Sequence, residues 1–208
     1  VIDGLTHAVT LVPTGARPYA LAVNTLTNRI YVANSEGYSV SVIDGATNSV
    51  STVSVDYYPN GIAVNEATDK VYVTNYHGNT VRVINGSDNS TVSIALAAGD
   101  NPHGLCINPV TNKIYVANIG NDSVKVINGA TDTIVATITA GTDPYFVAVN
   151  PVTNRVYVTN YSSDSVTVID GQTDTVIATI STGTDPSALV VDSMTGKVYV
   201  TNEGGSSV

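Results

Sequence analysis

Five side chains that could contact a ligand stand at one matching position of a repeated pattern, directly after a proline. They are Tyr19, Asn60, His103, Tyr145 and Ser187. Aromatic faces beside a few hydrogen-bonding groups suit the binding of sugars and peptides. We therefore predict a ligand site built from these side chains, and the alternative is that they are solvent-facing loop residues.

A second variable set follows each copy of a Tyr-Val-x-Asn phrase, and we assign four of its members to the same predicted site. They are Tyr76, His77, Tyr161 and Glu203. These positions differ between copies while their surroundings repeat. Repetition marks the scaffold, so variation marks either drift or function.

Metal chemistry has weak support in this sequence. His77 and His103 lie in neighbouring copies, and with Asp100 they could form a metal site. No short spacing between histidines supports that arrangement. We predict no metal and no cofactor.

Acid and base catalysis would need a pair of carboxylates with different environments. Asp143 and Asp185 recur at equivalent positions, as expected of residues that form turns. Asp100 also precedes an innermost strand, whereas Glu36 and Glu203 are less repeated. An enzyme would need an asymmetric polar cluster drawn from Glu36, His77, Asp100, His103 and Glu203. A hydrolase or lyase acting on a carbohydrate or lactone is therefore the alternative to a protein without catalytic residues.

Composition excludes several classes of partner. The formal charge is −9 and the eight Lys and Arg residues are scattered, so neither nucleic acid nor an anionic membrane surface would be attracted. No apolar run is long enough to cross a membrane. Cys106 is the only cysteine, which excludes an intrachain disulfide and a cysteine-based zinc site. A chain so low in cysteine and rich in Ser, Thr and Asn fits an exported protein, and we expect a mature or excised segment.

The elements that position these residues repeat along the chain. The tyrosines of the repeated phrase are separated by 41, 43, 42 and 42 residues and are Tyr31, Tyr72, Tyr115, Tyr157 and Tyr199. In the fourth copy, β-type runs occupy 144–150, 155–160, 165–170 and 175–181, with turn residues between them. Asp-Gly and Asn-Gly pairs at 44–45, 85–86, 128–129 and 170–171 are expected to supply the positive φ of hairpin turns.

Four antiparallel strands in about 42 residues form the unit of a β-propeller blade. The sequence therefore predicts an all-β propeller of five four-stranded blades, with the small, apolar first strand innermost. We expect a single domain over 1–208, closed into a ring by a last blade built from 186–208 plus 1–12. The alternatives are an open arc of blades and terminal strands exchanged between chains, and a monomer is favoured.

One asparagine ends the repeated phrase in every copy. These residues are Asn34, Asn75, Asn118, Asn160 and Asn202. A catalytic residue repeated five times is improbable, so we predict that these side chains tie the following loop to neighbouring backbone. By the same reasoning Cys106, which stands where other copies have Ala or Val, is expected to be a buried small hydrophobe.

The phrases NRIYVAN, DKVYVTN, NKIYVAN, NRVYVTN and GKVYVTN, with the N-P-x-T-N and V-I-D-G-x-T turns, resemble the YVTN β-propeller repeat. The resemblance covers essentially the whole chain. It implies a propeller of a bacterial or archaeal cell-surface, S-layer-associated or periplasmic protein. We accordingly predict a non-enzymatic binding module of an exported or surface protein that contacts protein or glycan, with a functionless fragment of a larger propeller as a further alternative.

Overall fold

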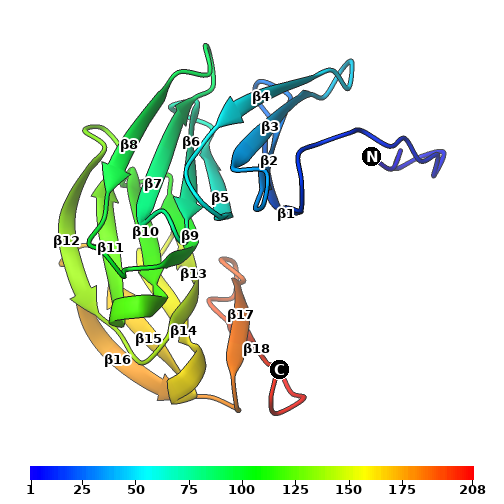
Figure 1. The fold of residues 1–208 in the computed structure, drawn as a ribbon. Helices are drawn as coiled ribbons and strands as arrows, with labels where there is room; N and C mark the ends of the chain where they lie inside the picture. The colour runs from blue at the N-terminus through cyan, green and yellow to red at the C-terminus, as the bar shows by residue number, and fades with distance from the viewer.

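The computed structural model describes residues 1–208 as a series of small antiparallel sheets arranged side by side around an axis (Figure 1). Blade 1 contains β1 (Pro18–Asn24), β2 (Arg29–Asn34), β3 (Ser39–Asp44) and β4 (Val50–Ser54). Blade 2 contains β5 (Pro59–Asn65), β6 (Lys70–Asn75), β7 (Thr80–Asn85) and β8 (Thr91–Ala95). Each strand pairs with the next along the chain, so every blade is a meander.

The later blades repeat this order. Blade 3 contains β9 (Pro102–Asn108), β10 (Lys113–Asn118), β11 (Ser123–Asn128) and β12 (Thr133–Thr139). Blade 4 contains β13 (Pro144–Asn150), β14 (Arg155–Asn160), β15 (Ser165–Asp170) and β16 (Thr175–Ser181), and blade 5 contains only β17 (Pro186–Val191) and β18 (Val198–Asn202). Two 3₁₀ turns, η1 (Ile119–Asn121) and η2 (Tyr161–Ser163), are the only helical segments, and neither has the length that a membrane-spanning helix needs.

The predicted all-β propeller class is confirmed, and the first strand of each blade is the innermost one. Consecutive first strands β1, β5, β9, β13 and β17 contact one another in that order. The fourth strands form the outer edge, as Figure 1 shows.

The hydrophobic core lies between blades, because a single sheet cannot bury both of its faces. Tyr31 and Val40 of blade 1 pack against Val71 of blade 2, and matching clusters join blades 2 and 3 and blades 3 and 4. The tyrosines Tyr31, Tyr72 and Tyr115 are completely buried in these clusters.

Polar contacts join blade 2 to a turn of blade 3 and blade 3 to a turn of blade 4. Lys70 Nζ lies 2.7 Å from Asp132 Oδ2, and the Tyr72 hydroxyl donates to Asp132 Oδ1 at 2.9 Å. Lys113 pairs with Asp174 in the same way, one blade further along. Residues i and i+2 of a strand point to the same face, so the cation and the tyrosine of the phrase together reach one carboxylate.

The predicted source of positive φ in the turns between third and fourth strands is wrong. Gly45, Gly86, Gly129 and Gly171 do not have positive φ, which falls instead three residues later on Asn48, Asn89, Asp132 and Asp174. The short polar side chains of Asn and Asp tolerate this conformation. The glycines are needed for another reason, since a Cβ there would collide with the side chain of Asn28, Asp69, Asn112 or Asn154.

The predicted closure of the ring does not occur in this structure. Residues 1–12 do not pair with β17 and β18; Ile2 bridges Val9 instead, and the segment extends away from the arc in Figure 1. The Val1 ammonium donates to the Thr10 carbonyl at 2.7 Å, so this segment satisfies its polar groups locally. In the predicted closed ring, the two ends of the chain would each supply half of the third strand of blade 5. Such short halves form few hydrogen bonds with the neighbouring strands, too few to offset the entropy lost when both ends are ordered. The extent of the domain, 1–208, stays a prediction.

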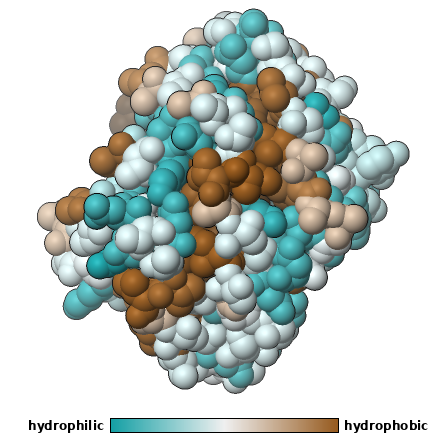
Figure 2. All heavy atoms as spheres, turned by 90° about the vertical axis from the view of Figure 1, so that its left-hand side faces the viewer, coloured by the Kyte–Doolittle hydropathy of each residue, from teal (hydrophilic) through white to brown (hydrophobic).

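The outer surface carries apolar side chains in bands between polar ones (Figure 2). Exposed members on the outer strands include Val92, Ile134, Val135, Val176 and Ile177. Ile134 and Val135 are consecutive in β12, and Val176 and Ile177 are consecutive in β16, where the strand register shifts.

Candidate ligand site at the axial mouth

A β-bulge at the start of each innermost strand aims the residue after the proline. In β1, Pro18 pairs with Asn34 and Ala20 with Ala33, which leaves Tyr19 without a partner. The register shifts at the same place in the other blades, at Asn60, His103, Tyr145 and Ser187. Bulges redirect side chains at the ends of sheets, so the local sequence explains why these five residues share one environment.

All five residues line a single cavity of about 480 Å³ at the axis. Apolar side chains deepen it, among them Leu21, Ile62 and Leu105. Gly104 lies on its wall, where a Cβ would stand 2.6 Å from the Tyr145 carbonyl oxygen, so glycine permits β9 and β13 to approach closely. The structure therefore brings the predicted set together, while its role in binding stays a prediction.

Aromatic rings from three blades line this cavity, and two further tyrosines contact those rings without lining it. The His103 and Tyr145 rings lie 4.1 Å apart and are inclined by 31°, and the Tyr19 ring stands edge-on to His103 at 6.5 Å. The ring centroids of Tyr161 and Tyr145 are 5.7 Å apart, and those of Tyr76 and His103 are 6.2 Å apart. Three tyrosines, Tyr19, Tyr76 and Tyr145, thus contact His103. Tyr161 extends the group through its contact with Tyr145.

The cavity is uncharged at neutral pH. None of its lining residues is Asp, Glu, Lys or Arg. His103 Nδ1 lies 3.1 Å from the Tyr145 carbonyl oxygen, and since a carbonyl only accepts, Nδ1 carries the proton and Nε2 is an acceptor. Burial lowers the pKa of His103 and, with the nearby Tyr19 phenol, raises the pKa of Tyr145 to about 12. Both groups are neutral donors or acceptors in this state.

None of the four predicted loop residues lines the cavity, although Tyr76 and Tyr161 contact aromatic rings on its wall. His77 is exposed and contacts the rings of Tyr58 and Tyr76. Glu203 is exposed, its backbone N–H donates to Asp185 at 2.9 Å, and its carboxylate raises the pKa of Tyr161, after the larger effect of Asp185.

The carboxylates proposed for catalysis do not face one another across the cavity. Glu36 is exposed and pairs with Arg17 at 3.0 Å. Asp100 is completely buried, where it accepts from the Ala97 backbone at 3.0 Å and lies 3.7 Å from Lys125 Nζ. Each is therefore engaged in a structural contact.

Asp143 and Asp185 both have a φ of 54°, in agreement with the predicted turn role. No group of three or more His, Cys, Asp or Glu side chains is placed to hold a metal ion. Cys106 is half-buried and packs against the cluster that contains Tyr115, and burial raises the pKa of its thiol.

Sequence reasoning missed three tyrosines near this site, Tyr38, Tyr57 and Tyr58. The ring centroid of Tyr38 lies 4.9 Å from that of Tyr57 and 5.8 Å from that of Tyr58. The ring centroids of Tyr58 and His77 are 4.7 Å apart. A usable signal was present, because Tyr38 and Tyr58 occupy turn positions where most other copies have Asn or Asp.

We expect His103 to make the protein less stable in mild acid. Its pKa is lowered in the folded state, so the unfolded chain binds the proton more readily below the ordinary value of about 6.5. The contribution of neutral His103 to the free energy of unfolding should be complete above that pH. It should decrease as the pH falls toward the lowered pKa of the folded state. Urea midpoints measured between about pH 7.5 and pH 5 should therefore vary less in His103→Gln than in the wild type. An identical pH dependence in both proteins would contradict this assignment.

Comparisons with known proteins bear on the fold. None of the curated proteins matches the chain. Hydrazine synthase from Kuenenia stuttgartiensis has a similar fold, with a TM-score of 0.80 and 22% identity over 95% of this chain and 58% of that chain. A functionally unknown protein from Desulfotomaculum acetoxidans DSM 771 is similar with a TM-score of 0.79 and 15% identity over 91% of this chain and 64% of that one. This chain thus spans less than two thirds of either protein, and identities so low show the fold alone.

A match to a family model assigns the chain to a protein family more directly than these structural similarities do. The YNCE-like beta-propeller model matches residues 57–206, which include every residue predicted for the ligand site except Tyr19. The narrower resemblance to the YVTN repeat stays a prediction. The chain belongs to the YNCE-like beta-propeller family.

Proposed function

We propose that this chain is a non-enzymatic binding module that holds an uncharged ligand at the axial mouth. The observation that carries the proposal is the convergence of five variable residues, one from each blade, on one cavity in an otherwise repetitive scaffold. A cavity lined by Tyr and His rings with Asn60 and Ser187 offers apolar faces and hydrogen bonds but no charge. Such a lining suits a neutral sugar or a neutral peptide segment.

The proposal also places the protein outside the cytoplasm, on the cell surface or in the periplasm. Its support is compositional, since the chain has one cysteine and a surface rich in Ser, Thr and Asn. An enzymatic role finds less support, because the cavity contains no carboxylate that could act as acid, base or nucleophile.

Isothermal titration calorimetry with neutral disaccharides and with blocked, uncharged dipeptides tests the binding role. We expect one of the two classes to bind, and Tyr145→Ala to lower its affinity at least about tenfold, because the variant loses a stacked aromatic face. Tyr199→Ala is the matched control, since Tyr199 is 48% exposed on β18 and lies outside the cavity. The proposal fails if neither class binds, or if the two variants bind equally well.

A further inference from the structure

One lead-in segment departs from the repeat in a coordinated way. Before the innermost strand the other copies read GARP, GDNP, GTDP and GTDP, whereas blade 2 reads DYYP over 56–59. Asp56, in place of glycine, lies 2.7 Å from Arg82 and accepts from the Thr80 hydroxyl at 2.6 Å. Arg82 stands where blades 1 and 4 have Ser41 and Thr167 and where blade 3 has Lys125. Lys125 likewise faces a carboxylate of its own lead-in segment, Asp100, at 3.7 Å. The charged pair compensates the substitution, so the segment is a built feature and not an isolated change.

This departure creates a row of five aromatic rings, Tyr57, Tyr38, Tyr58, His77 and Tyr76, which we call the aromatic ledge. Neighbouring centroids along it are 4.9, 5.8, 4.7 and 4.8 Å apart. Its inner end, Tyr76, contacts His103 in the axial cavity. At its outer end a second cavity of about 250 Å³ is lined by Tyr38, Val55, Asp56 and Tyr57. The ledge therefore connects two cavities.

The backbone is strained where the ledge is built. Tyr38 has a φ of 46° and Tyr58 a φ of 56°. The left-handed region is unfavourable for a large side chain and is tolerated by Asn and Asp. The matching residues are Asn79, Asp122, Asp164 and Ser206 for Tyr38, and Arg17, Asn101, Asp143 and Asp185 for Tyr58. Strain of this kind is retained at functional sites when the side chain itself is needed.

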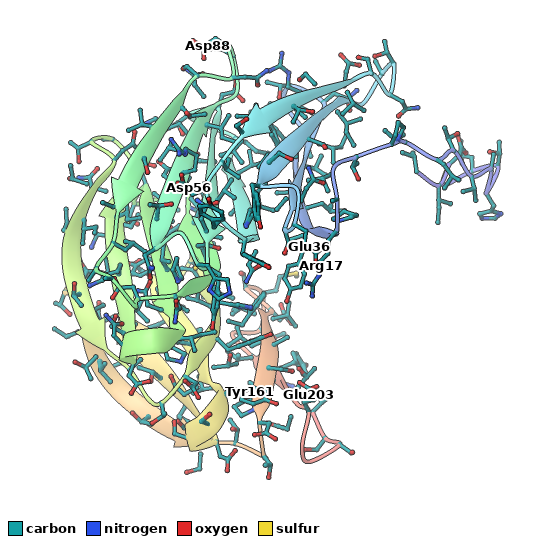
Figure 3. All side chains as sticks on the ribbon, viewed as in Figure 1. Arg17, Glu36, Asp56, Asp88, Tyr161 and Glu203 are labelled. Carbon is teal, nitrogen blue, oxygen red and sulfur yellow. The ribbon has the colours of Figure 1, made fainter.

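The ledge carries no unpaired charge of either sign beside its outer cavity. Asp56 is neutralised by Arg82. Desolvation, with a smaller contribution from the charge of Glu36, raises the pKa of Tyr38, and Glu36 itself pairs with Arg17 at 3.0 Å. Figure 3 shows Arg17 and Glu36 close together. Tyr57 and Tyr38 are 62% and 39% exposed, so their rings are available to a ligand. An extended neutral molecule with apolar faces fits this surface better than a polyanion.

We propose that the aromatic ledge binds a linear, neutral polysaccharide whose chain continues from the axial cavity to the outer cavity beside Tyr57. The faces of pyranose rings are apolar C–H surfaces that stack on aromatic rings, and their hydroxyl groups meet the phenol and imidazole groups. This inference rests on the proposed function and deepens it, because the axial cavity supplies the first subsite and the ledge supplies the others.

Calorimetry with oligosaccharides of increasing length tests the ledge. The probes are cello-, manno-, malto- and chito-oligosaccharides of two to six units, with polygalacturonate, an oligothymidylate and uncharged peptides for comparison. At least one neutral series should gain about tenfold or more in affinity from dimer to hexamer, as expected when further stacked subsites are filled. The charged polymers should show no such gain. Tight binding of oligothymidylate or of peptides alone, or no gain in any neutral series, overturns the proposal.

Two variants separate the ledge from the mouth. Tyr57→Ala should lower hexamer affinity about tenfold and leave dimer affinity unchanged, whereas Tyr145→Ala should weaken both. Tyr38→Asn should also reduce the gain with length while raising the midpoint of thermal unfolding by about 2–4 °C, because backbone strain is relieved. A fall in that midpoint contradicts the strain argument. If dimers bind through Tyr145 but Tyr57→Ala and Tyr38→Asn have no effect on hexamers, the ledge fails and the proposed function stands.

Discussion

Tyr115→Ala should lower the free energy of unfolding by about 3–5 kcal/mol, the usual cost of removing a large buried aromatic side chain. Tyr115 has no exposed surface and packs between blades 3 and 4 with Val126, Val156 and Ile169. Its hydroxyl lies 3.4 Å from Asp174, so truncation also removes a polar contact across the blade interface. Urea denaturation followed by circular dichroism measures the change.

The repeat itself provides the control for this experiment. Tyr199 is the same residue at the same position of the phrase, but it is 48% exposed because no further blade covers it in this structure. Tyr199→Ala should therefore cost less than about 1 kcal/mol. Tyr115→Phe, which keeps the ring, should cost about 0.5–1.5 kcal/mol. Equal losses in Tyr115→Ala and Tyr199→Ala would show that packing between blades does not stabilise the chain as described.

Asn160→Ala should destabilise the protein by about 2–4 kcal/mol, because buried hydrogen-bonding groups would lose their partners. Asn160 is completely buried and donates to Ser165 Oγ at 3.1 Å and Thr167 Oγ1 at 2.9 Å. Its oxygen accepts from the Gly141 backbone N–H at 3.1 Å, which joins the second strand of blade 4 to the loop before its first strand. The midpoint and slope of urea denaturation report the loss.

Asn202 is the matched control for Asn160. Its amide makes a single side-chain hydrogen bond, to Ser207 Oγ at 3.2 Å, and its oxygen has no partner. Asn202→Ala should therefore cost about 1 kcal/mol or less. If Asn160→Ala kept its stability but lost binding of the disaccharide or dipeptide probes, the structural role predicted for the repeated asparagines would be wrong.

Much of the architecture could be predicted from the residues alone. Regular spacing of Tyr31 and its counterparts predicted the blade, and alternation of β-branched residues predicted the strands, because both are local properties of the chain. The residue after each proline was predicted to reach the axial mouth, and the structure places all five such residues on one cavity. Because the local sequence around the proline is similar in all five copies of the repeat, the residue that follows it takes the same place in each blade. One prediction therefore applied to every copy.

Contacts between blades could not be predicted in this way. Lys70 and Tyr72 of the phrase reach Asp132 about sixty residues later, a pairing that depends on how one sheet packs on the next. The failure of the N-terminal segment to close the ring was also not predicted, because closure depends on pairing between the two ends of the chain and not on any one repeat.

The aromatic ledge is the clearest example of this division. The sequence shows tyrosines at 38 and 58, where most other copies have Asn or Asp, and at 57, where the others have Ala, Asp or Thr. These residues come from two different loops, one between β2 and β3 and the other between β4 and β5. Local propensity determines where a chain turns, and it predicts the strands and their order. Only the packing of blade on blade brings the two loops together, and it alone decides that scattered tyrosines form one continuous surface.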